Sequence, residues 1–154
     1  MTGTPSDALP RPLVLIALAA LGVPRVIAHD LNLVGQTINA VLVFAPIAVW
    51  IGYVLWQRVP NPLLTLLAVG VCYGLLLAFT HQLLWDAAFA DDPPRLSGNL
   101  EGSLSPGTEE VVLRVFSVGS SVITGALQGA ATGILAWFLA KITDRRPRIR
   151  GDAE

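Results

Sequence analysis

Cysteine and charge are both scarce in this 154-residue sequence. Its one cysteine, Cys72, lies inside an apolar run, so the chain forms no internal disulfide, and the thiol is expected to be a small buried apolar group. Charged residues make up 14 % of the chain, whereas soluble domains carry about 25 %. The formal net charge of −1 offers no basic surplus for binding nucleic acid, so no nucleic-acid partner is expected.

Motifs for catalysis and nucleotide binding are also missing. The sequence has no Walker motif, no dinucleotide-binding glycine fingerprint, no G-x-S-x-G element and no cysteine pair. Few charges fall at the centre of the apolar runs, where coupled transporters commonly place them, which argues against an autonomous pump. The two histidines lack the H-E-x-x-H spacing of a metal site, so no cofactor is predicted; haem or a transition metal stays open as an alternative.

Four long apolar runs are what the sequence does contain. Because uncharged runs of this length need a solvent other than water, they predict an all-α, polytopic integral membrane protein. Its fold is expected to be a bundle of four transmembrane helices in a lipid bilayer. We expect a single membrane domain over 1–154, with helices at about 12–29, 37–57, 62–86 and 106–142, an extracytoplasmic loop at 87–105 and a basic cytoplasmic tail at 143–154.

Prolines mark the boundaries and bends of these helices. Pro46 is expected to kink the second helix without breaking it, because neighbouring helices can satisfy the carbonyl that it frees. Asn61 followed by Pro62 predicts a side-chain cap and a proline at the first helical position. The first run leaves two alternatives open. It is either a retained helix or a signal peptide cleaved after Ala28, although Arg25 and the proline before it are a poor approach to a peptidase.

Basic residues gather at one end of the predicted bundle. Four spans place both termini on one side, and most of the lysines and arginines flank the spans on that side. In the long loop on the other side, acidic residues outnumber Arg95. This asymmetry predicts a multi-pass protein of the cell membrane with cytoplasmic N- and C-termini. The basic residues on the predicted cytoplasmic side are Arg11, Arg58, Lys141, Arg145, Arg146, Arg148 and Arg150.

A stripe of small residues runs along the fourth predicted helix at intervals of four. In lipid, such a stripe lets two helix backbones approach closely. Two interpretations stay open: the stripe packs inside the four-helix bundle, or it meets a second copy or lines a polar path. Hydroxyl residues beside the stripe are expected to bond back to their own helix carbonyls if the stripe packs internally. The stripe consists of Ser117, Ser121, Gly125, Gly129 and Gly133.

Polar side chains converge at the extracytoplasmic ends of three predicted helices. The structural interpretation is that the arginines extend to the headgroups and that the other members are turn residues in water. Three functional interpretations compete with it: His29 and His81 as weak candidates for a transition-metal site, the same pair as axial ligands of a haem, or proton and substrate handling by His81 and Asp86. The candidate cluster consists of Arg25, His29, Asp30, His81, Gln82, Asp86, Glu110 and Arg114.

The small-residue stripe and the missing catalytic motifs together favour a non-enzymatic function. We expect a small integral membrane protein that acts as a packing or accessory subunit of a homo- or hetero-oligomeric membrane complex, with itself or another membrane protein as partner. The alternative is a protein that handles a small solute, protons or a metal ion through the cluster of His, Asp and Glu side chains in the outer leaflet. A haem-binding protein or another membrane enzyme comes third.

Overall fold

The computed structural model describes residues 9–143, and all of their regular elements are helices. Four segments are long and apolar enough to cross a membrane, which agrees with the predicted number and helical class. Beyond Thr143, the predicted basic tail lies outside the described residues. The elements are α1 (Pro12–Ala20), α2 (Val23–Asp30), α3 (Gln36–Gln57), α4 (Pro62–Ala88) and α5 (Pro106–Ile142), with a short 3₁₀ helix, η1 (Gly98–Leu100), in the loop before α5.

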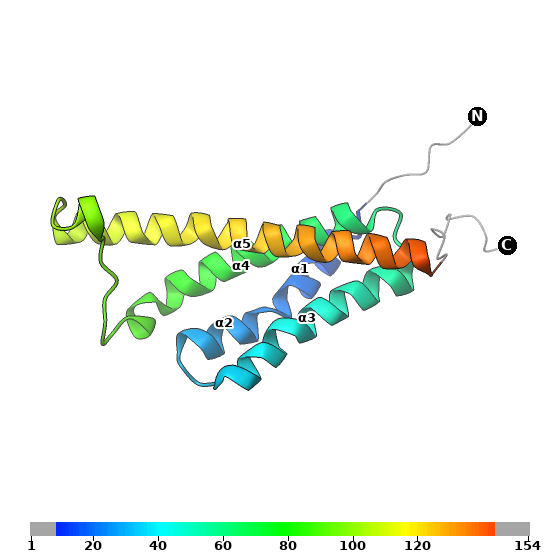
Figure 1. Ribbon diagram of the computed structural model, residues 1–154, viewed down its shortest axis with the longest axis horizontal. Coiled ribbons are helices and arrows are strands. Elements are labelled where there is room, and N and C mark those ends of the chain that lie inside the picture. The colour runs from blue at the N-terminus through cyan, green and yellow to red at the C-terminus, as the bar shows by residue number, and fades with distance from the viewer. Residues whose placement is uncertain (1–8, 144–154) are drawn as a thin grey trace, which may run out of the picture.

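The helices run up and down, so each end of the bundle collects different connections (Figure 1). The start of α1, the turn between α3 and α4 and the end of α5 lie at one end, here called the turn end. The α2–α3 turn and the long loop before α5 lie at the opposite end, here called the loop end, where α2 and the start of α3 diverge from α5. Half of the most apolar stretch of α4 is buried, compared with 17 % of that of α3, so α4 is central and α3 peripheral.

The first predicted helix, 12–29, is wrong in one respect, because the structure divides it into two helices. A turn at Leu21 and Gly22 separates α1 from α2. Pro24 has no N–H to donate to the carbonyl four residues earlier, and glycine is a poor helix former. A Cβ on Gly22 would also lie 2.8 Å from Cδ2 of Tyr73, so the approach of α4 requires a glycine here. The α1–α2 pair still forms one of the four apolar spans.

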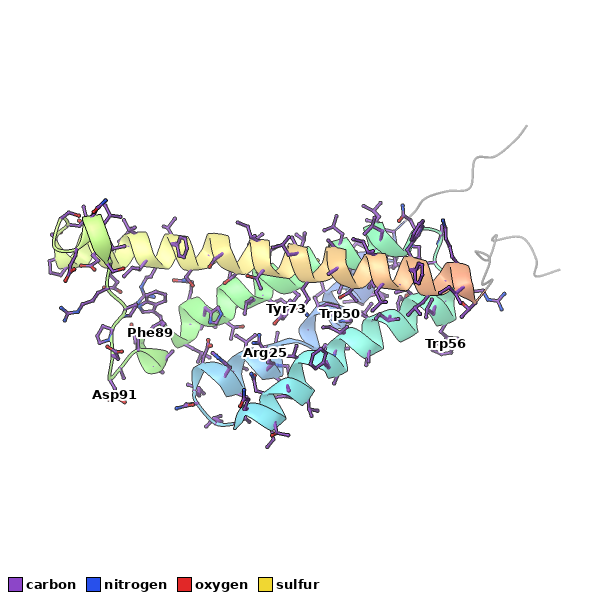
Figure 2. All side chains as sticks on the ribbon, viewed as in Figure 1. Arg25, Trp50, Trp56, Tyr73, Phe89 and Asp91 are labelled. Carbon is purple, nitrogen blue, oxygen red and sulfur yellow. The ribbon has the colours of Figure 1, made fainter. Side chains whose placement is uncertain are left out.

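A tryptophan from α3 bonds to the backbone at this break. Trp50 Nε1 donates a buried hydrogen bond of 2.7 Å to the carbonyl of Leu18, which also accepts from the Leu21 amide at 3.2 Å. The Gly22 amide, which would bond Leu18 in a continuous helix, donates to Ala19 instead. The Trp50 ring is fully buried and meets Tyr73 edge-on, with the ring centroids 5.9 Å apart. Figure 2 shows both rings in the interior, whereas Trp56, at the end of the same helix, points away from it. Trp50 therefore joins α1, α3 and α4 at one point.

Glycines bring α4 and α5 into backbone contact, and we call this contact the glycine seam. A Cβ on Gly125 would lie 2.5 Å from Cα of Gly74, and one on Gly129 would lie 2.8 Å from Cα of Gly70. The stripe on the fourth predicted helix therefore lies against α4 of the same chain, as in the first of its two interpretations, and α4 supplies its own small-xxx-small pair. Ser121, Gly125, Gly129 and Gly133 are buried in the structure, and Ser117 is half-buried.

Several local features agree with the signals in the sequence. Helix α3 continues without interruption through Pro46. Asn61 Oδ1 accepts a hydrogen bond of 3.0 Å from the Leu64 amide, which confirms the predicted cap of α4. The hydroxyl of Thr132 donates to the Gln128 carbonyl at 2.7 Å, in the expected back-bonding pattern. The cap and the back-bond depend on neighbours within one helix.

Candidate functional site

The predicted polar cluster lies at the loop end, where the structure divides it into two networks. One network connects α2 to α4, and the other connects α4 to α5. Arg25 has no ion pair or hydrogen bond to either network and lines a cavity between α2, α4 and α5. The histidine–aspartate bridge consists of His29, Asp30 and His81, and the arginine network consists of Gln82, Asp86, Glu110 and Arg114.

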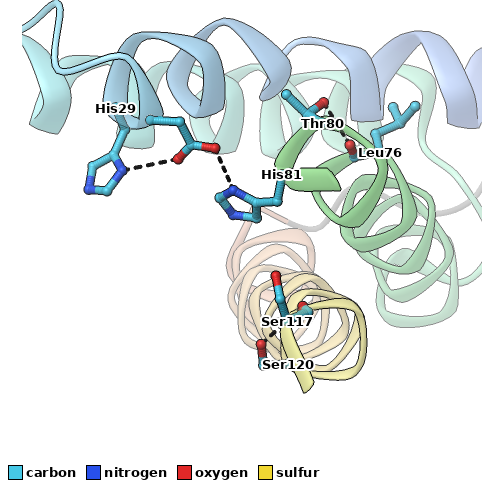
Figure 3. A network of polar contacts seen from close by, with 7 residues as sticks. His29, Leu76, Thr80, His81, Ser117 and Ser120 are labelled. Carbon is cyan, nitrogen blue, oxygen red and sulfur yellow. Dashed lines mark hydrogen bonds and ion pairs between the residues drawn. The ribbon is translucent and has the colours of Figure 1, made fainter. Parts of the chain in front are cut away.

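Asp30 is the centre of the histidine–aspartate bridge (Figure 3). Its Oδ2 lies 2.5 Å from Nδ1 of His81, and its Oδ1 lies 3.3 Å from Nδ1 of His29. The Asp30 side chain is only 6 % exposed. A carboxylate only accepts hydrogen bonds, so each imidazole donates through Nδ1, and a neutral ring then keeps Nε2 as its acceptor. The bridge therefore presents two atoms that can take up a proton beside a nearly buried carboxylate.

The position of Asp30 is unfavourable locally and depends on tertiary contacts. Asp30 is the last residue of α2, where the helix dipole disfavours an anion. The stabilising hydrogen bonds come from the two imidazoles instead. Helices α2 and α4 run parallel, because Gly22 meets Tyr73 and Asp30 meets His81 at the same offset of 51 residues. The close contact at Gly22 thus sets the register that brings His81 to the carboxylate.

A cavity of about 210 Å³ lies beside the bridge, between α2, α4 and α5. Arg25 faces it from α2, and its Nε is buried without a hydrogen-bond partner, so it is not simply extended to the surface. Buried polar atoms are usually paired, which makes this nitrogen an exception that needs a reason. Sequence reasoning did not include the α5 residues of this cavity in the cluster, although their spacing on one helix face was a signal. They are Ser120, Ser121 and Thr124.

Arg114 organises the second network. Its Nη2 lies 3.0 Å from Oδ1 of Asp86 and its Nε lies 2.8 Å from Oε1 of Glu110. Its guanidinium stands 4.9 Å from the centroid of the Trp85 ring, and Gln82 donates to its backbone carbonyl at 3.3 Å. The Asp86 side chain is 93 % exposed, and such exposed pairs contribute less than about 1 kcal/mol each. The arginine network is therefore a surface clamp between α4 and α5.

The long loop at 89–105 is attached to the start of α5. Leu96 N–H donates to Oε1 of Glu109 at 2.5 Å. A second cavity, of about 420 Å³, lies between this loop, the end of α4 and the start of α5. The rings of Trp85 and Phe89, with centroids 4.8 Å apart, line it. No local pattern predicts the contact between Leu96 and Glu109, because it joins residues from a loop and a helix.

The geometry gives little support to a metal or haem site. Within residues 9–143, no three His, Cys, Asp or Glu side chains are placed to hold a metal ion. His29 and His81 direct their Nδ1 atoms to one carboxylate. A haem with two histidine ligands needs one ring nitrogen on each side of the iron, but here Asp30 lies between the two rings. Neither cofactor interpretation gains a ligand set from these residues.

The chain matches no protein-family model, no curated protein and no solved structure at a significant level.

Proposed function

We propose that the chain is a multi-pass protein of the cell membrane, with cytoplasmic termini and the loop end outside. Four apolar helical segments support insertion. The basic residues Arg58 and Lys141 at the turn end, against the acidic residues of the loop, support the orientation. We also propose that the first segment is retained. Leu15, Leu18 and Val26 belong to the hydrophobic core, and cleavage after Ala28 would remove them from it.

The orientation predicts which of two introduced cysteines reacts in intact cells. In a Cys72→Ala background, Ser103→Cys in the loop is expected to react with a membrane-impermeant maleimide. Gln57→Cys at the turn end is expected to react only after the membrane is permeabilised. Both side chains are exposed, so burial does not explain a difference. Labelling of Gln57→Cys in intact cells, with Ser103→Cys protected, would reverse the proposed orientation.

We propose further that the protein handles a small ionic solute, protons included, at the loop end. The observation that carries this proposal is the nearly buried Asp30, held between two imidazoles beside a polar cavity. In a bilayer, ionisable groups below the headgroups are costly, and they mark ion and proton pathways. An imidazole has one nitrogen that can donate a proton and one that can accept a proton, so the bridge has the chemistry of a proton relay.

Replacement of Asp30 tests this function. In liposomes loaded with a pH-sensitive dye, wild-type protein is expected to pass protons under a potassium-diffusion potential faster than empty liposomes do. Asp30→Asn keeps the side-chain volume but removes the charge that holds both rings. The rate above background is expected to fall about tenfold or more, which corresponds to a barrier change of ~1.4 kcal/mol.

Asp86→Asn is the matched control, because Asp86 is an exposed carboxylate of the arginine network. It is expected to pass protons at the wild-type rate. If Asp30→Asn and Asp86→Asn behave alike, or if wild-type liposomes leak no faster than empty ones, the bridge does not conduct protons, and the proposed handling of protons is incorrect.

A second candidate function is the packing or accessory subunit of a larger membrane complex. The small residues of α5 pack against α4 of the same chain, so they are not available to a partner. The observation that favours this candidate lies on α3. Its exposed face carries Ala48 and Gly52, four residues apart, and a Cβ on Gly52 would meet nothing within 4 Å. Mass photometry in nanodiscs, compared between wild type and Gly52→Leu, is expected to show an oligomer that the substitution weakens. A wild-type monomer that co-purifies with no other membrane protein would contradict this candidate.

A further inference from the structure

Arg25 lies deeper in the bundle than the other ionisable groups of the loop end. The offset of 51 residues between α2 and α4 places Arg25 level with Leu76, nine residues before Trp85. At 1.5 Å per residue, this is ~13 Å along the helix axis from the tryptophan. A guanidinium at this depth is costly in a bilayer unless a partner or a polar cavity compensates it. Its buried Nε has no such partner among the described residues.

The carboxylate closest in sequence does not neutralise Arg25. Each oxygen of Asp30 already meets an imidazole Nδ1, and no ion pair between Arg25 and Asp30 is present among the described residues. Glu110 and Asp86 are engaged by Arg114. The Asp30 carboxylate thus bonds to His29 and His81. The guanidinium of Arg25, which lines the cavity, has no carboxylate partner among the described residues.

The rest of the cavity is lined by the histidine–aspartate bridge, by two apolar side chains and by small polar groups of α5. Helix α5 presents the hydroxyls of Ser120, Ser121 and Thr124, and none of the α5 residues that line the cavity is charged. The Ser120 hydroxyl already donates to the Ser117 carbonyl at 3.1 Å, so Ser121 and Thr124 supply the hydroxyl donors for a ligand without adding charge. The volume of about 210 Å³ is below the range of drug-sized sites, about 300–1,000 Å³, so the occupant is small.

We propose that this cavity binds a small oxyanion, a carboxylate or phosphate group, on the guanidinium of Arg25. A planar guanidinium can offer two parallel N–H donors to two oxygens of such a group, and this geometry distinguishes it from a lysine ammonium. The ligand oxygens neutralise the guanidinium charge of this half-buried arginine. The inference rests on the proposed function, since it names the class of solute that the loop-end cavity takes.

Calorimetric titration of the purified protein in a maltoside detergent, which contains no phosphate, tests the proposal. Sodium acetate and inorganic phosphate are the probes, and sodium chloride is the comparison. At least one oxyanion is expected to bind at least about tenfold more tightly than chloride, a difference of ~1.4 kcal/mol. If chloride binds as tightly as both oxyanions, the cavity recognises charge alone and the proposal is overturned.

Substitutions assign the binding to Arg25. Arg25→Gln is expected to weaken oxyanion binding at least about tenfold, and Arg25→Lys to weaken it as well, because the charge stays but the planar pair of donors is lost. Arg95→Gln removes an exposed guanidinium of the loop and is expected to bind as the wild type does. Circular dichroism checks that each variant folds. If Arg25→Gln does not fold, the binding measured with Arg25→Lys decides the question. Unchanged binding in the folded Arg25 variants would refute the site.

Two sources of the oxyanion are separated by adding phospholipid. If added phospholipid competes with acetate or phosphate, the natural ligand is a lipid headgroup; if it does not, the ligand is a free solute. Both results support the oxyanion site. Oxyanion binding without proton conduction would overturn the proton handling and leave this inference intact. Proton conduction without oxyanion binding would overturn this inference alone.

Discussion

Gly129→Leu is expected to separate α4 from α5 and to lower the stability of the protein by about 3 kcal/mol or more, at the upper end of the cost of overpacking. A Cβ at this position would lie 2.8 Å from Cα of Gly70, and the neighbouring atoms are backbone, which cannot rotate away as a side chain can. A leucine also adds three further carbons to a contact with no space. Thermal unfolding in detergent, followed by loss of monodisperse protein on size exclusion, measures the effect.

Gly119→Leu is the matched control on the same helix. A Cβ on Gly119 would meet nothing within 4 Å, so the same change is expected to be neutral or slightly stabilising, since leucine is the better helix former. If Gly129→Leu melts at the same temperature as the wild type and Gly119→Leu, then the stripe is not a packing contact, and the assignment of the glycine seam is wrong.

Trp50→Ala is expected to cost about 3–5 kcal/mol, the range for truncating a large buried side chain. Trp50→Phe keeps most of the ring but removes the donor to the Leu18 carbonyl at the break between α1 and α2. Loss of this hydrogen bond is expected to cost about 0.5–1.5 kcal/mol, because the Leu18 carbonyl keeps the bond from the Leu21 amide. The two substitutions therefore separate packing from the hydrogen bond, and both are measured as changes in the temperature of unfolding.

Trp56 offers the comparison for both changes, because it lies on the same helix with 74 % of its surface exposed. Trp56→Ala and Trp56→Phe are expected to alter stability by no more than about 0.5 kcal/mol, as surface substitutions usually do. Equal losses at Trp50 and Trp56 would show that Trp50 has no special part in joining α1, α3 and α4.

Much of the fold follows from signals that act within one segment. Helix α5 begins at Pro106 and ends at Ile142 as predicted, because a proline at its start and a long apolar stretch define it locally. The cap at Asn61 also depends only on neighbouring residues. Hydropathy and helix-start chemistry are short-range properties, so the sequence displays them directly.

The remaining features depend on contacts between segments. The break at Gly22 was not predicted because it reflects both Pro24 and the ring of Tyr73, which is distant in the chain. The polar cluster was predicted as one group, since its members share one level of the bundle. Its division follows from the faces of α4 on which they lie: His81 turns toward α2, while Asp86 turns toward α5.

The free nitrogen of Arg25 is the clearest case of what a sequence leaves hidden. The sequence places an arginine near the end of an apolar run, where extension to the headgroups is the simplest expectation. Only the three-dimensional contacts reveal that Asp30 is engaged by His29 and His81 and that Arg25 faces hydroxyls of α5. Pairing of charges within a cluster is a property of geometry and not of composition.

The two-residue turn at Leu21 and Gly22 has a mechanical consequence. It makes α2 an eight-residue rod with its own axis, and that rod carries Arg25, His29 and Asp30 together. The rod therefore places all three groups as one block relative to His81 and the hydroxyls of α5. Its position depends on the packing of Gly22 against Tyr73 and of Val26 in the core, and the backbone contact of α4 with α5 does not involve it.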